Sequence, residues 1–147
     1  MRVIAGCVII KDDKILMVKE GKESCYGQWN YPAGHVEDFE KISEGALRET
    51  FEETGCKVKL TGLLPIISID YKNESHLLIR FTAEMVEENI SYDGDEILDV
   101  KWIKMDEIKN MKEEELRGYE TAIKTVRDIE NKNTYPVEVF DNNKYSS

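Results

Sequence analysis

The chain has 147 residues, and 20 basic against 30 acidic side chains give it a net charge of −10. This length allows one domain with its own core, over residues 1–147, and leaves no room for a second full domain. With 41% hydrophobic and 34% charged residues, the composition is that of a soluble globular protein, which excludes a disordered or collagen-like chain. The negative charge and the absence of a Lys/Arg-rich run argue against a nucleic-acid polymer as the partner.

The cysteines and the apolar runs bear on the compartment. Cys7, Cys25 and Cys56 are odd in number and form no CxxC pair, so we expect neither a disulfide framework nor a zinc site. Residues 3–10 are the longest early apolar run, too short to span a membrane and without a cleavage site of small residues. We therefore expect a cytoplasmic protein with no membrane anchor.

The first third of the chain predicts a hairpin, a loop and a helix. Residues 3–10 and 15–18 are rich in apolar and β-branched side chains and flank a charged turn, which is typical of a β-hairpin. Residues 20–31 form a loop. Ala, Leu, Glu and Arg then dominate residues 40–54, and Gly55 stands where a helix commonly ends.

The remaining chain predicts three more strands and a second helix. We expect strands over residues 58–69, 76–84 and 100–103, an acidic loop preceding the last of them. Residues 112–129 carry an amphipathic helical stripe formed by Leu116, Tyr119, Ile123 and Val126. The pattern predicts an α/β fold in which helices cover a mixed sheet.

The first helix concentrates carboxylates on one face. Glu49, Glu52 and Glu53 are related by three and four residues, so they fall within an arc of about 100°. We expect the helix to pack on the sheet through a different arc, formed by Leu47, Thr50, Phe51 and Thr54. The helix thus separates a packing face from an anionic one.

The anionic face is either a solvated acidic stripe or a cation site. Electrostatics favour the second interpretation, because like charges one turn apart cost about 0.2–0.5 kcal/mol per pair. Acids in the last helical turn cost about another 0.3–1 kcal/mol each. Carboxylate oxygens suit Mg²⁺, or Mn²⁺ in its place, and Arg48 is placed to fix the orientation of a carboxylate.

The spacing of seven residues resembles the signature of the Nudix hydrolase family. These residues are Gly34, Glu40, Arg48, Glu49, Glu52, Glu53 and Gly55. Two positions that are usually bulky aliphatics in that signature are Thr50 and Cys56 here, a departure that concerns packing more than chemistry. The resemblance implies the Nudix fold, an α/β/α sandwich, and hydrolysis of a nucleoside diphosphate linked to another moiety, or of a similar diphosphate.

Site residues follow from the resemblance. It implies that Glu49, Glu52 and Glu53 bind the metal together with the Gly34 carbonyl, that Arg48 orients a glutamate, and that Glu40 braces the loop against the helix. The segment Gly27, Trp29 and Pro32 to Glu37 is similar to a subgroup that resembles the hydroxymethylpyrimidine pyrophosphate phosphatases. Those enzymes also act on nucleoside di- and triphosphates, and residues 116–140, with Tyr135 and Pro136, match their closing segment.

The general base and the substrate contacts are less constrained. Glu52 and Glu53 lie close to the proposed metal, and the resemblance implies that a later loop can also supply the base, here the acidic loop of Asp95, Glu96 and Asp99. We favour Glu96. Tyr26, Trp29 and Tyr31 are candidates to stack on a heterocyclic base, although Trp29 fits a packing anchor equally well. Arg80 points either to a phosphate or to solvent. We expect Trp102 in the core and structural or surface roles for His35 and His76, with His35 beside the proposed metal.

We therefore expect a Mg²⁺-dependent hydrolase of small diphosphates or nucleotides, as a monomer or homodimer. The alternative is a module of the same fold that senses a phosphorylated metabolite without cleaving it. A different reaction on the same scaffold is a third interpretation, and it would require additional catalytic Cys and Glu positions that the sequence does not place.

Overall fold

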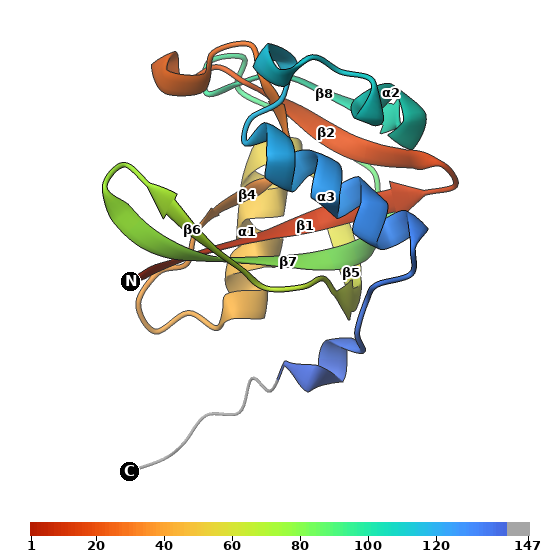
Figure 1. Cartoon of the computed structure of the whole chain (residues 1–147). Coiled ribbons are helices and arrows are strands. Elements are labelled where there is room, and N and C mark those ends of the chain that lie inside the picture. Colours follow the sequence, from red (N-terminus) through yellow and green to blue (C-terminus); the bar gives the residue numbers. More distant parts are fainter. Residues whose placement is uncertain (141–147) are drawn as a thin grey trace.

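A mixed β-sheet forms the centre of the computed structural model, which describes residues 1–140 (Figure 1). Its strands are β1 (Arg2–Lys11), β2 (Lys14–Glu20), β3 (Trp29–Asn30), β4 (Ala33–His35), β5 (Lys57–Leu63), β6 (Ile67–Tyr71), β7 (Glu74–Glu87) and β8 (Ile97–Lys104). β1 runs parallel to β7, and the other pairings are antiparallel. The predicted α/β class with a mixed sheet is confirmed.

Helices cover both faces of this sheet. They are α1 (Ile42–Thr54), α2 (Met105–Lys109) and α3 (Tyr119–Glu130), with short 3₁₀ turns at Glu23–Cys25, Glu113–Glu115 and Val137–Val139. Figure 1 shows α1 behind β1 and β7 and α3 in front of them. One apolar cluster includes Ala46 of α1, and another includes Ile123 and Val126 of α3. The two clusters give the fold three layers.

The hairpin and the first helix lie where the sequence places them. β1 and β2 turn at Asp12, which adopts a left-handed φ of 56°. At the start of α1 the Glu44 carboxylate accepts the Lys41 N–H at 3.1 Å, which pairs one of the free donors of a helix start. Gly55 ends the helix in the left-handed conformation, with φ 76°. A Cβ at this position would also collide with the Asn89 carbonyl oxygen, so glycine is required.

The packing face of α1 differs from the predicted one. Thr50 and Thr54 are buried, but Phe51 is 52% exposed and Leu47 is only half-buried. Ala46 is completely buried and Cys7 donates its thiol hydrogen to the Ala46 carbonyl. Small side chains therefore allow close approach of the helix to β1, and the arc predicted through Phe51 was wrong.

Two predicted elements are each divided. The strand expected over 58–69 ends at Leu63, and β6 begins at Ile67, because Pro65 lies between them and cannot donate to a ladder. The helix expected over 112–129 begins only at Tyr119. Leu116 is extended, forms a bridge with Trp29 and packs in the core beneath α3, so the apolar stripe joins two different segments.

The chain returns to the sheet after α3. Leu63 and Tyr135 exchange backbone hydrogen bonds of 2.8 Å, and the ring of Phe140 meets Phe81 edge to face at 5.8 Å. Cys7, Cys25 and Cys56 are buried and free. Within residues 1–140 no helix has the length and apolarity needed to cross a bilayer. Residues 141–147 lie outside the described part, so the single domain over 1–147 stays a prediction.

Candidate active site

The loop that contains β4 meets the acidic face of α1. β4 pairs with β1, which fixes Gly34 opposite Ala5. The space that a Cβ on Gly34 would occupy is filled by the Glu49 carboxylate. One residue earlier, the Ala33 N–H donates to Glu53 Oε1 at 3.0 Å. Glycine at position 34 is therefore required for the Glu49 carboxylate to approach the loop backbone.

Arg48 joins the loop to the helix. Its Nε donates to Glu40 Oε2 at 2.6 Å, and its Nη2 donates to Glu40 Oε1 at 3.0 Å. The same Nη2 reaches the His35 carbonyl at 3.1 Å. Nη1 pairs with Glu49 Oε1 at 3.0 Å and with Glu52 Oε2 at 3.2 Å. The fork with Glu40 is a bidentate, charge-assisted contact, which holds the guanidinium while it orients the two other carboxylates.

The pKa shifts separate the glutamates into two groups. The hydrogen bonds from Arg48 hold the pKa of Glu40 below its usual value. Burial raises the pKa of Glu49. Burial and then the charges of Glu20 and Glu49 raise the pKa of Glu53 to about 8. Glu49 and Glu53 thus lie where negative charge is disfavoured unless a cation accompanies it.

Glu20 is a site residue that the sequence analysis missed. It ends β2 at a register shift, is only 3% exposed, and lies close enough to Glu53 to raise its pKa. Its Oε2 accepts the Cys25 thiol at 3.4 Å and pairs with Arg117 Nη1 at 3.4 Å. Nothing in the local sequence predicts this, because Arg117 comes from the other end of the chain.

The donor set fits a hard divalent cation, although the side chains do not converge on one position. Among residues 1–140 no group of three or more His, Cys, Asp or Glu side chains is arranged to hold a metal ion. Glu52 is exposed and turned toward Arg48. Glu49, Glu53 and the Gly34 backbone nevertheless share one junction. There Arg48 pairs with Glu49, whereas among residues 1–140 no salt bridge reaches the Glu53 carboxylate, which Glu20 and Glu49 repel. Oxygen donors of this kind suit Mg²⁺ or Mn²⁺.

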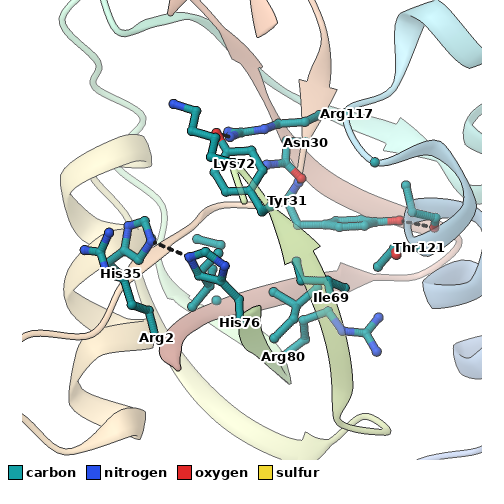
Figure 2. Close-up of a pocket in the computed structure, with 18 of the residues that line it drawn as sticks. Arg2, Asn30, Tyr31, His35, Ile69, Lys72, His76, Arg80, Arg117 and Thr121 are labelled. Atoms are coloured by element: carbon teal, nitrogen blue, oxygen red, sulfur yellow. Dashed lines mark hydrogen bonds between the residues drawn. The ribbon is translucent and has the colours of Figure 1, made fainter. Parts of the chain in front are cut away.

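A cavity of about 550 Å³ opens beside this junction. It extends from Gly34 and His35 across β6 and β7 to Arg117 and the start of α3, as Figure 2 shows in part. His35 and His76 face each other on its wall with their Nε2 atoms 3.3 Å apart, and burial lowers the pKa of His35. This volume suits a ligand of nucleotide size.

Tyr31 and Arg80 line the cavity but use their polar atoms elsewhere. The Tyr31 hydroxyl donates to the Ala122 carbonyl at 2.9 Å, and burial raises the pKa of this phenol. Arg80 is 3% exposed and donates to Thr125 and, at 2.8 Å, to the Pro65 carbonyl. Figure 2 shows its guanidinium directed away from the histidines. Arg80 thus links β7 to α3, rather than pointing to solvent.

The two remaining aromatic candidates lie away from the cavity wall. Tyr26 is 68% exposed on the loop after β2. Trp29 is half-buried against the core beneath α3, with Lys19 Nζ and Lys101 Nζ at 5.9 and 5.5 Å from its ring centroid. Neither side chain is among the described residues that line the cavity. Trp102 packs against the apolar cluster that includes Ala46 of α1, and its indole N–H donates to Glu88.

Glu96 lies in an exposed turn beside the end of β2. Its carbonyl accepts the Gly21 N–H at 2.8 Å, and the Asp95 carbonyl fills the space that a Cβ on Gly21 would need. Asp93 fixes the turn by accepting the N–H groups of Asp95 and Ile97. The turn is therefore anchored next to Glu20, the residue that lies beside Glu53.

The fold and the loop–helix junction define an α/β/α protein with a carboxylate site beside a nucleotide-sized cavity. Residues 1–125 match the family model described as NUDIX domain, and the chain belongs to this family. A NUDIX hydrolase from Nitrosomonas europaea superposes with a TM-score of 0.85 at 27% identity, covering 99% of this chain and 97% of that one.

Two curated relatives carry more specific names. The 8-oxo-dGDP phosphatase NUDT18 of Danio rerio is 47% identical over 62 residues, which is 42% of this chain and 19% of that protein. The NAD-capped RNA hydrolase NudC of Escherichia coli is 32% identical over 108 residues, which is 71% of this chain and 41% of that protein. The chain thus spans less than half the length of these relatives.

Proposed function

We propose that the protein is a metal-dependent hydrolase that cleaves a phosphoanhydride in a nucleoside di- or triphosphate or a related small diphosphate. The observation that carries the proposal is the meeting of Gly34, Glu49 and Glu53 at one end of a cavity of about 550 Å³. Relatives named for 8-oxo-dGDP and for NAD-capped RNA support a nucleoside diphosphate derivative as the substrate.

We assign the metal ligands to Glu49, Glu52, Glu53 and the Gly34 carbonyl, with Mg²⁺ as the ion and Mn²⁺ as its substitute. When bound, such an ion neutralises the diphosphate and lowers the pKa of a bound water. Arg48 contributes by holding Glu49 and Glu52 through direct contacts while Glu40 fixes its guanidinium. For Glu52 to join the other ligands, its exposed side chain must turn away from Arg48.

A proton acceptor is the second requirement of the reaction. We assign it to Glu96, which is exposed on the turn anchored beside Gly21 and so can reach water. Glu53 with a pKa of about 8 holds its proton at neutral pH when no cation accompanies it. A bound cation would displace this proton, and we therefore assign Glu53 as a ligand and not as the base.

Substrate contacts come from two groups of residues. Tyr31 and Arg80 lie in the cavity wall, where the Tyr31 ring offers a surface for a heterocyclic base and Arg80 adds positive charge beneath it. Tyr26 and Trp29 remain candidates only for a part of the substrate that extends along the loop after β2. The net charge of −10 favours small substrates over nucleic-acid polymers. We place the protein in the cytoplasm as a monomer or a homodimer.

The alternative is a sensor module that binds a phosphorylated metabolite without cleaving it. The half-buried Glu49 and Glu53 argue against it, because a module that only binds an anion has no use for carboxylates in a position that raises their pKa values. A third possibility, another reaction on the same scaffold, requires catalytic Cys and Glu positions; Cys25 donates to Glu20 instead.

A substrate screen tests the proposal. The protein is incubated with Mg²⁺ and with 8-oxo-dGDP, nucleoside triphosphates, ADP-ribose, dinucleoside polyphosphates or hydroxymethylpyrimidine pyrophosphate, and phosphate and pyrophosphate release are measured. We expect release from at least one nucleoside diphosphate derivative, abolished by EDTA and by Glu53→Gln. Tight binding of one compound without release from any would favour the sensor.

A further inference from the structure

Arg117 stands out among the cations of the cavity wall because its guanidinium is fixed on two sides. Nη1 lies 3.4 Å from the buried Glu20 carboxylate. Nη2 donates to the Tyr71 hydroxyl at 2.8 Å, and this bond reaches the tip of the β6–β7 hairpin, as Figure 2 shows in part. Its backbone is fixed too, because the Arg117 N–H donates to the Trp29 carbonyl at 3.0 Å.

The other cations of the wall are either engaged or loosely held. Arg80 is buried and bonded to Thr125 and the Pro65 carbonyl. Arg2 pairs at 3.9 Å with Glu74 on the exposed rim. Lys72 lies over the Tyr71 ring in the hairpin turn, and Lys22 is an exposed side chain on the loop after β2. Arg117 alone combines a fixed position with a side chain that remains 28% exposed.

Its donors are not exhausted by these contacts. A guanidinium carries five N–H groups, and among residues 1–140 the hydrogen bond to Tyr71 and the ion pair with Glu20 are its polar side-chain contacts. The free donors border a cavity that begins at Gly34 and His35. Planar, positively charged donors held in advance are suited to a phosphate group and lose little entropy on binding it.

We propose that Arg117 binds the phosphate attached directly to the organic part of the substrate, which is the α-phosphate of a nucleotide. Glu20 and Tyr71 are its positioning residues. The inference rests on the proposed function for the identity of the ligand. The scissile anhydride would lie at the Gly34 end of the cavity, so the phosphate bound by Arg117 stays with the monophosphate product. The contact is then equal in substrate and product, and it contributes to binding rather than to the chemical step.

The test measures equilibrium binding in EDTA, which removes the metal from the measurement. The probes are 8-oxo-dGMP and the four ribonucleoside monophosphates, each compared with its uncharged nucleoside by calorimetry. We expect Arg117→Gln to weaken binding of the monophosphate by about ten- to hundredfold and to leave binding of the nucleoside unchanged. Arg117→Lys should restore part of the loss, since it keeps the charge without the fork.

Two further variants keep the test decisive. Arg117→Gln leaves Glu20 buried without its ion pair, which can destabilise the fold, so the double variant Glu20→Gln/Arg117→Gln is measured beside it and should show the same loss. Arg127→Gln, an equal charge change on the exposed face of α3, is the matched control and should bind as the original protein does.

Activity gives an independent readout on any substrate found in the screen. Arg117→Gln should raise KM by about tenfold or more and change kcat by less than about twofold. The inference is overturned if the original protein binds none of these monophosphates, or if the folded double variant binds them as tightly as the original protein does. The proposed function fails separately, through absence of metal-dependent release in the screen.

Discussion

Replacing Glu53 with Gln should stabilise the metal-free protein at alkaline pH while it abolishes hydrolysis. Burial, Glu20 and Glu49 raise the pKa of Glu53 from 4.5 to about 8. The group is therefore protonated in the folded protein and ionised in the unfolded chain between these two pH values. The free energy of unfolding is therefore unaffected by Glu53 below pH 4.5, and it falls as the pH rises from 4.5 toward 8.

The size of the effect follows from the shift. A shift from 4.5 to about 8 would cost at most about 4 kcal/mol at pH 8, and Glu53 is partly exposed, so we expect roughly 2–3 kcal/mol after screening by solvent. Gln is uncharged and keeps the side-chain oxygen that accepts the Ala33 N–H. The variant should therefore escape most of this loss.

Urea denaturation in EDTA at pH 5, 6, 7 and 8 measures the difference. Relative to the original protein, Glu53→Gln should gain stability progressively between pH 5 and 8. Glu52→Gln is the matched control, because Glu52 lies one position earlier on the same helix but is exposed, and its stability should follow that of the original protein. Parallel curves for the original protein and Glu53→Gln across this range would refute the assigned burial of the charge.

Three more variants test the junction and the cavity wall. Gly34→Ala places a methyl group where the Glu49 carboxylate lies, so turnover with Mg²⁺ should fall by about a hundredfold in a phosphate-release assay; normal turnover would contradict the close approach. Arg48→Ala leaves Glu40 uncompensated and should cost about 3 kcal/mol in urea denaturation, whereas a loss below about 0.5 kcal/mol would mean that the bidentate contact does not form. Tyr31→Phe removes the bond to the α3 backbone and should cost about 1 kcal/mol; an unchanged midpoint would argue that this hydroxyl is solvated.

Much of the junction could be predicted because its residues lie close together in the sequence. Gly34, Glu40, Arg48, Glu49 and Glu53 lie within one loop and one helix, and helical periodicity alone puts the carboxylates on one face. The structure brings these residues together. Glu52 is the exception, since its position on the helix allows it to turn toward solvent and Arg48.

Contacts between distant segments could not be predicted in this way. Glu20, Tyr71 and Arg117 meet only because the fold brings the end of β2 and the β6–β7 hairpin against the segment that precedes α3. Periodicity also fails where backbone geometry changes inside an apolar pattern. Leu116 continues the stripe of α3 in sequence, yet it pairs with Trp29 as extended chain, because Gly118 adopts a left-handed φ of 58° directly before the helix.

The central claim is that α1 and the Gly34 loop bind a divalent cation between them. A crystal soaked in Mn²⁺ tests it directly through the anomalous signal of the metal. The account predicts a peak bounded by the carboxylates of Glu49 and Glu53 and the Gly34 carbonyl, with Glu52 turned toward it from Arg48. A crystal that binds Mn²⁺ elsewhere, or one with no peak at this junction, would contradict it.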